Sequence, residues 1–364
     1  MQADNWQREA ESCILTPEMP HAFAHILTLF TTVLAVAGMG YFVAAMLAAR
    51  LFLAERRAPL AAFAPGVSLL KSLKGLDPGM IDAFRSHCRQ SYAGEFELLF
   101  GVATLDDPAV AAVRQLIAEF PERSIRLVVC PERLGTNGKV STLVQLAAHA
   151  RCDFLLINDS DITVSPRYLE RVMACFASNE TSSSAYQAPE KLDSLKGTGF
   201  SPYIHPANTA GALAPEEDSF PISFEILSLS AASSAPAVGL VTALYRGHAH
   251  GTLPSRLEAL GIATDFQAGV LLSKWIEGGL HYGLGSTLAV RREALAKIGG
   301  LQLLVDHLAD DYELGARVSG AGFRIALSPE VVETNIAAYG WRGYLDHQLR
   351  WARTVRDARF ARWR

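Results

Sequence analysis

The chain has 364 residues, a formal net charge of −4 and a hydrophobic content of 50%. This length suffices for one large domain or two small ones with a real core. The slight acidity gives no support for a nucleic-acid partner, which needs a basic face. The five cysteines are scattered and form no C-x-x-C pair, which argues against a disulfide framework and against a zinc site.

An apolar segment near the N terminus, residues 22–49, contains no Asp, Glu, Lys or Arg. It exceeds the roughly 20 residues that a helix needs to span a bilayer. Acidic residues lie in the preceding tail, 1–21, whereas Arg50, Arg56 and Arg57 follow the segment. The positive-inside rule therefore predicts an extracytoplasmic tail and a cytoplasmic C-terminal bulk, in a single- or multi-pass protein of the cell (inner) membrane. A buried core helix is the alternative, and a cleaved signal peptide fits the long apolar region less well.

Strand and helix patterns alternate along residues 65–346. In the first half, we expect strands at 67–70, 96–102, 125–129 and 154–157, with helices at 110–120 and 139–150. This order predicts an α/β domain with a parallel, doubly wound sheet. Later strands are expected at 238–245 and 285–290, and later helices at 254–275, 291–298 and 308–318. The intervening segment 177–235, rich in Ser, Ala and Pro, predicts a largely disordered insertion.

A polar run follows the apolar strand at 154–157, whose composition is typical of a strand buried on both faces. Ligands of open α/β sheets bind beyond the carboxyl ends of such strands. Asp159 and Asp161 have the spacing that directs both carboxylates to one side of an extended backbone. They can therefore bind one divalent cation, Mg²⁺ or Mn²⁺, which commonly accompanies a nucleotide diphosphate. The alternative is an acidic turn in which Asp161 caps the next helix.

Further polar groups lie at the ends of other predicted strands. Lys71 and Lys74 follow the first strand, either to meet a phosphate or as ordinary exposed loop lysines. The turns Asp106–Ala109 and Gly135–Lys139 follow the next two strands. At this edge of the sheet, such turns would hold the base and ribose of a nucleotide.

Two features near the C terminus carry charge. Asp310 and Asp311 open a predicted helix, where either can cap the helix or act as an exposed, rigidly held catalytic base. Residues 347–364 contain six arginines and two tryptophans. This composition predicts an interfacial helix on anionic lipid, with a solvated basic tail as the alternative.

Seven motifs occur in a fixed order along the chain. They are Pro65–Lys71, Lys74–Pro78, Asp106–Ala109, Asn158–Ile162, Val238–Gly247, Ala309–Tyr312 and His347–Trp351. As an ordered set they resemble the ceramide glucosyltransferase family, whose bacterial branch includes hopanoid-associated glycosyltransferases. The resemblance covers residue 65 to the C terminus apart from the insertion.

The resemblance implies a Rossmann-like GT-A fold and an enzyme that moves a hexose, with inversion, from a UDP-sugar to a lipid hydroxyl. The sugar would be glucose or N-acetylglucosamine, and the acceptor ceramide or a hopanoid. The implied nucleotide-sugar ligands are Asp107, Lys139, Asp159 and Lys71, and the implied metal ligands are Asp159 and Asp161. The implied diphosphate or acceptor residues are His347, Gln348, Arg350 and Trp351. Asp311, next to Asp310, is implied as the base, with a pKa that the helix N terminus keeps low.

Three features depart from the family pattern. His347 stands where the family has Gln or Arg, and Thr142 replaces the second Asn of an N-x-K-x-x-N-L motif. The chain ends at Arg364, whereas family members continue into further membrane helices, which is typical of a fragment or a shortened product. Two other functions stay open: a processive polysaccharide synthase, which needs several spans, and a catalytically silent, membrane-tethered nucleotide or lipid binder.

Overall fold

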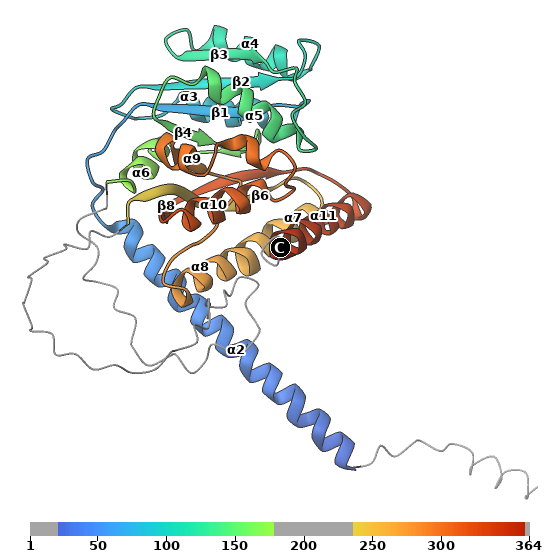
Figure 1. Ribbon diagram of the computed structural model, residues 1–364. Coiled ribbons are helices and arrows are strands. Elements are labelled where there is room, and N and C mark those ends of the chain that lie inside the picture. The colour runs from blue at the N-terminus through green and yellow to red at the C-terminus, as the bar shows by residue number, and fades with distance from the viewer. Residues whose placement is uncertain (1–20, 178–235, 361–364) are drawn as a thin grey trace, which may run out of the picture.

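The computed structural model describes residues 21–177 and 236–360 (Figure 1). The expectations for the tail 1–21 and for the insertion 177–235 therefore fall almost wholly outside the described residues, as do residues 361–364.

The first half of the domain is the predicted parallel layer. Its strands are β1 (Val67–Ser72), β2 (Phe96–Val102), β3 (Ser124–Val129) and β4 (Phe154–Ile157), in the order β3-β2-β1-β4. The helices between them are α3 (Met80–Cys88), α4 (Ala109–Glu119) and α5 (Gly138–His149). The doubly wound prediction is confirmed, and α3 is additional to the predicted elements.

The second half extends this layer into a mixed sheet. Its strands are β5 (Ile162–Thr163), β6 (Val238–Ala249), β7 (Leu288–Arg291) and β8 (Arg324–Ile336). Within the described residues, the whole sheet has the order β3-β2-β1-β4-β7-β6-β8-β5. Strand β7 runs antiparallel to β4 and β6, and β8 pairs parallel with β6. The sequence analysis predicted β6 and β7 but not β8.

Helices of the second half cover the sheet and extend beyond it. They are α6 (Tyr168–Ala174), α7 (Leu253–Gly261), α8 (Gln267–Ile276), α9 (Arg292–Lys297), α10 (Asp310–Gly320) and α11 (Trp341–Phe360). The predicted helix at 254–275 is present as α7 and α8, which a π-helical turn, Ile262–Phe266, joins without a break. A short 3-10 turn, Leu301–Leu304, precedes α10.

Alternate residues of the central strands face two separate cores. Leu70 and Leu155 lie in a core with α5, α9 and α10, whereas Leu69 and Leu156 lie in a core with α3, α4 and α6. This division explains why β4 is apolar throughout, because helices cover both of its faces. Helices thus cover both faces of the central sheet, and a ligand can reach it only at the ends of its strands.

Helix α2 (His21–Arg57) is the long apolar element at the N terminus. Its C-terminal part packs on α8, with Ala45, Ala48 and Phe52 buried and Glu55 2.6 Å from Lys274. Among the described residues, this helix alone is long and apolar enough to cross a membrane, and its most apolar window is not buried in the protein. The alternative of a buried core helix is therefore wrong for this window.

Candidate active site

One edge of the sheet gathers polar loops from both halves of the chain. The carboxyl ends of β1 to β4 share this edge because the strands are parallel. The pairing directions also bring the amino end of β7 and the carboxyl ends of β6 and β8 there. The loops surround a cleft of about 1870 Å³, which α11 and the π-helical turn close on one side. This is the edge at which the sequence predicted a ligand.

Lys139 joins two of the predicted acidic residues. Its ammonium lies 2.7 Å from Oδ1 of Asp159 and 3.6 Å from Oδ2 of Asp310. Burial acts to lower the pKa of Lys139, but the charges of Asp159 and Asp310 outweigh it and raise the pKa. The structure thus brings together residues that are 20 and 171 positions apart and holds Lys139 charged.

Asp161 lies next to β8 and is not a helix cap. The hydroxyl of Thr334 donates to its carboxylate, and the amide of Asn335 donates 2.9 Å to its backbone carbonyl. The next helix, α6, has Arg167 at its N-cap position with no side-chain cap. The capping alternative is therefore wrong. Burial raises the pKa of Asp161, the hydrogen bond from Thr334 opposes this, and the charge of Asp159 adds to it.

The donor set at this edge fits a cation that arrives with a diphosphate. Within the described residues, no group of three or more His, Cys, Asp or Glu could hold a metal ion alone. Mg²⁺ is usually bound by one or two carboxylates together with substrate phosphates. Asp159, whose side chain is 43% exposed, and Asp161 both line the cleft and supply such a pair.

Asp311 reaches into the cleft from the first turn of α10. Its Oδ2 accepts a hydrogen bond from the backbone of Gly285 at 2.8 Å, and its Oδ1 accepts one from Tyr312. A Cβ at Gly285 would lie 3.1 Å from Asp311 Oδ2 and 3.6 Å from Asp159 Oδ2. Because Gly285 carries no side chain, its backbone can approach these two carboxylates closely.

The expectation of a low pKa for Asp311 is wrong. Burial, together with the charge of Asp310, raises the pKa of Asp311 to about 6. The charge of Lys139 and the hydrogen bond from Tyr312 oppose the rise without cancelling it. The helix N terminus is outweighed because the carboxyl lies out of water beside a second carboxylate.

Asp107 lines the cleft, but its carboxylate accepts hydrogen bonds from backbone N–H groups. Its Oδ1 accepts hydrogen bonds from Gly75 at 3.0 Å and from Ala109 at 2.9 Å. It therefore joins the loop after β1 to the start of α4. Its predicted contact with the nucleotide stays a prediction.

Lys71 lies below the cleft. The last residues of β1 extend past the predicted end, so Lys71 belongs to the strand and is 1% exposed. Its ammonium donates to the backbone carbonyl of Asp159 at 3.0 Å. Burial lowers its pKa to about 7, although the charges of Asp159 and Asp161 oppose this. The alternative of an exposed loop lysine is wrong, and in this conformation Lys71 supports the Asp159 loop from beneath.

Asn137 is a polar residue that the sequence analysis did not single out. It caps α5 by accepting from Val140, and its amide donates to the carbonyl of His307 at 2.8 Å and to Asp310 at 3.4 Å. It therefore holds the start of α5, which carries Lys139, against the start of α10. Its place just before a helical pattern was the available sequence signal.

Three of the four predicted residues of the C-terminal motif line the cleft: His347, Arg350 and Trp351. Gln348 is partly buried on α11 but is not among the lining residues. Nδ1 of His347 lies 2.9 Å from the carboxylate of Glu258, whose side chain is 3% exposed. Glu258 also lines the cleft, and the sequence analysis missed it because α7 and α11 are far apart in the chain.

The chain is similar in sequence to known glycosyltransferases. The chain is 22% identical over 289 residues to ceramide glucosyltransferase 3 of Caenorhabditis elegans, which covers 79% of this chain and 50% of the relative. It is 24% identical over 287 residues to ceramide glucosyltransferase 1 of the same organism, covering 79% and 49%. The chain thus spans about half the length of these curated relatives.

The fold is similar to that of the mannosyltransferase PcManGT from Pyrobaculum calidifontis, solved with GDP-Man and Mn²⁺. The TM-score is 0.52 at 17% identity, and the match covers 90% of this chain and 74% of that one. This likeness confirms an α/β, GT-A-like fold with a mixed sheet. The family model of glycosyl transferase family 21 matches residues 30–191 and 224–362. The chain therefore belongs to glycosyl transferase family 21.

Proposed function

We propose that this protein transfers a hexose, glucose or N-acetylglucosamine, from a UDP-sugar to the hydroxyl of a membrane lipid, with inversion at the anomeric carbon. The acceptor would be ceramide or a hopanoid alcohol. Family membership supports a glycosyltransferase, and the similarity to ceramide glucosyltransferases supports a lipid acceptor. The observation that carries the proposal is that Asp159 and Asp311 both line the cleft and both approach Gly285.

Asp311 would accept the proton of the lipid hydroxyl. The acceptor oxygen then bonds to the anomeric carbon while the bond from that carbon to the diphosphate breaks, and UDP leaves. A pKa of about 6 suits this role, because the carboxylate is ionised at neutral pH and is a stronger base than an ordinary Asp. The hydrogen bonds from Gly285 and Tyr312 fix its direction.

Positive charge would stabilise the departing diphosphate. Lys139 supplies a charge beside Asp159, and Arg350 lines the same cleft from α11. Asp159 and Asp161 would hold a divalent cation, which when bound offsets negative charge on the leaving oxygens. Asp107 keeps the neighbouring loop in place for the nucleotide.

Helix α2 would anchor the protein to the cell (inner) membrane with the catalytic domain on the cytoplasmic side. Its length and apolar composition support an anchor. Arg56 and Arg57 in its last turn support this orientation.

The proposal is tested by transfer in membranes that contain the chain. Radiolabelled UDP-glucose and UDP-N-acetylglucosamine are supplied with ceramide or a hopanoid alcohol, with and without Mn²⁺. We expect a labelled lipid from one donor and one acceptor, and no label from the Asp311→Asn variant. UDP binding without any labelled lipid would favour a silent binder, and a labelled polymer would favour a processive synthase.

A further inference from the structure

One part of the cleft carries a cluster of aromatic and aliphatic side chains. These come from β6, from the π-helical turn and from α11. They are Tyr245, Ile262, Phe266, Trp351, Val355 and Ala358, and we call them the apolar chamber. Such a lining suits an alkyl chain.

The inner end of the chamber is buried, and its outer end, the mouth, is exposed to solvent. The ring of Phe266 lies 4.8 Å from that of Tyr245 and 6.1 Å from that of Trp351. Ile262 is 2% exposed, whereas Val355 on α11 is 41% exposed. The chamber therefore opens to the outside along α11. The π-helical turn at Ile262–Phe266 lies in its wall, and such turns occur frequently at functional sites.

Helix α7, beside the chamber, buries polar residues and exposes apolar ones, which is the reverse of the usual arrangement for a helix in water. Its buried residues include Ser255 and Glu258, at 0% and 4% exposure. Leu253 and Leu260 are 58% and 56% exposed, and Leu257, which shares their face, is also exposed. A helix that buries polar groups and exposes leucines is matched to an apolar surrounding.

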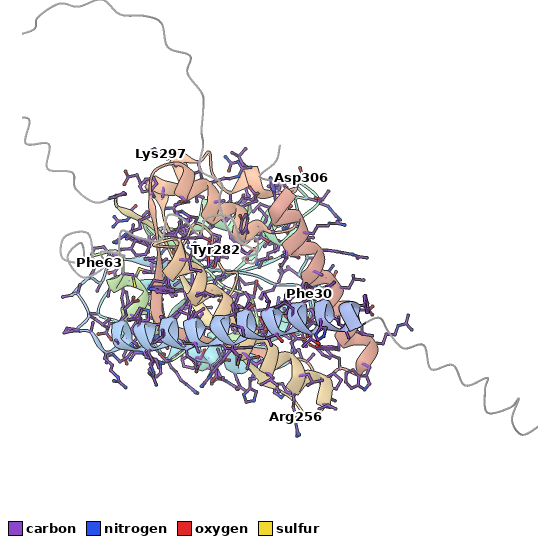
Figure 2. All side chains as sticks on the ribbon, turned by 90° about the horizontal axis from the view of Figure 1, so that it is seen from below. Phe30, Phe63, Arg256, Tyr282, Lys297 and Asp306 are labelled. Atoms are coloured by element: carbon purple, nitrogen blue, oxygen red, sulfur yellow. The ribbon has the colours of Figure 1, made fainter. Side chains whose placement is uncertain are left out.

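Helix α11 continues this apolar surface. Leu345 and Leu349, one turn apart, are 62% and 50% exposed, and α11 packs against α7. Both helices lie on the side of the domain from which α2 extends, as Figure 1 shows. Figure 2 views the molecule from below, and in it α2, labelled at Phe30, and α7, labelled at Arg256, lie on the same face of the domain. The mouth of the chamber thus lies on the side of the domain from which α2 extends, and among the described residues α2 alone is long and apolar enough to cross a bilayer.

A polar pair lies with the chamber in the same cleft. The carboxylate of Glu258 is held by Nδ1 of His347, whose ring lies 5.6 Å from that of Trp351. Within the described part of the chain, no hydrogen bond is made by Nε2 of His347. This pair can therefore meet the hydroxyl or amide group of an amphiphile whose chain fills the chamber.

We propose that the apolar chamber binds the alkyl chain of the lipid acceptor, which enters sideways from the bilayer between α7 and α11, with its polar head at the Glu258–His347 pair. This inference rests on the proposed function and names the acceptor site. The acceptor is a long-chain amphiphile with a hydroxyl group, the chemical class of ceramide.

The first test uses the full chain in membranes and a ceramide with a photoreactive diazirine in its acyl chain. After irradiation we expect adducts on peptides from 253–276 and 341–360. UDP binding is measured on the same membranes. Adducts confined to other segments, or none, with UDP still bound would overturn the chamber. Loss of UDP binding by the unmodified chain would instead count against the proposed function.

The second test narrows the mouth. Val355→Trp should raise the KM for long-chain ceramide about tenfold or more, since small changes in apolar pockets have effects of this size. The KM for the UDP-sugar should stay unchanged. Ile117→Trp, at a residue on α4 that is 37% exposed, is the matched control and should change neither. An equal rise in both KM values, or none in either, would overturn the proposal.

Discussion

Lys139 lies within 4 Å of two carboxylates at one end of the cleft, whereas at the other end Phe266 packs against Tyr245 and Trp351. At the charged end, the side chains come from a strand-end loop and from the first turns of α5 and α10, and Lys139 pairs with two carboxylates. At the apolar chamber, helices hold the side chains, and packing determines the space. The charged contacts fix the orientation of side chains, whereas the packing fixes the volume of the chamber. Changes at the two ends should therefore affect the binding of different substrates.

Asp311→Asn should have the largest effect and separates chemistry from binding. Loss of a general base typically costs 10²- to 10⁴-fold in rate, so we expect kcat to fall by this order while UDP binding is kept. Asp310→Asn is the control, because Asp310 faces Lys139 rather than Gly285. Asp310→Asn should act mainly on the KM for the UDP-sugar. Equal loss of UDP binding and transfer in Asp311→Asn would refute the base assignment.

Gly285→Ala tests the close approach of Gly285 to the carboxylates of Asp311 and Asp159. The new Cβ would lie 3.1 Å from Asp311 Oδ2, so the base must shift by a few tenths of an ångström. Misplaced reacting groups cost up to about 100-fold, so a loss of roughly 10- to 100-fold in kcat/KM is expected, with thermal stability little changed. Gly320→Ala in the same helix as Asp311 meets nothing within 4 Å and should be silent. Full activity in Gly285→Ala would show that transfer does not depend on this position of the Asp311 carboxylate.

Lys139→Met tests the charged end of the cleft. Without the ammonium, Asp159 loses the partner that orients it and the diphosphate loses a positive charge, so binding of Mn²⁺ with UDP should weaken about tenfold, as for other partners of metal ligands. Isothermal titration would measure this. Adducts of the photoreactive ceramide should be unaffected, because Lys139 is not part of the chamber. A parallel loss of lipid adducts would show that the two ends are coupled.

The pH profile should show the smallest effect, a shift rather than a loss. Because Asp311 acts as a base only when ionised, kcat/KM should fall as the pH drops through about 6. An unperturbed Asp would lose activity only near pH 4. The charge of Asp310 raises the pKa of Asp311, so Asp310→Asn should move this limb to lower pH. If the acidic limb of the pH profile keeps its position in Asp310→Asn, the assignment of Asp311 as the base is contradicted.

The charged end was largely predictable because it follows from chain order. Polar turns after parallel strands meet at one edge, so Asp159 and Lys139 could be brought together without a structure. Lys71 could not be placed, because β1 extends two residues beyond its apolar run and buries it. The raised pKa of Asp311 was also out of reach, since it depends on burial and on Asp310 in three dimensions.

The apolar chamber was largely hidden from sequence reasoning. Its walls come from β6, the π-helical turn and α11, and no local pattern links them. Strand β8, whose end helps shape the cleft, contains Pro329 and no clean alternation, so it gave no strand signal. The signal that was present is the inverted helix α7, in which Glu258 is buried and Leu253 is exposed.

The contact between α2 and α8 links the long apolar helix to the wall of the cleft. A helix of 37 residues is about 55 Å long, well beyond the roughly 30 Å of a hydrocarbon core. In a bilayer the excess is accommodated by tilt or by leaving the membrane. Because Glu55 is tied to Lys274 and Phe52 is buried, a change of tilt must carry α8 with it. For the membrane anchor proposed above, α2 would transmit a change of membrane thickness to α8 and so to the position of the catalytic domain.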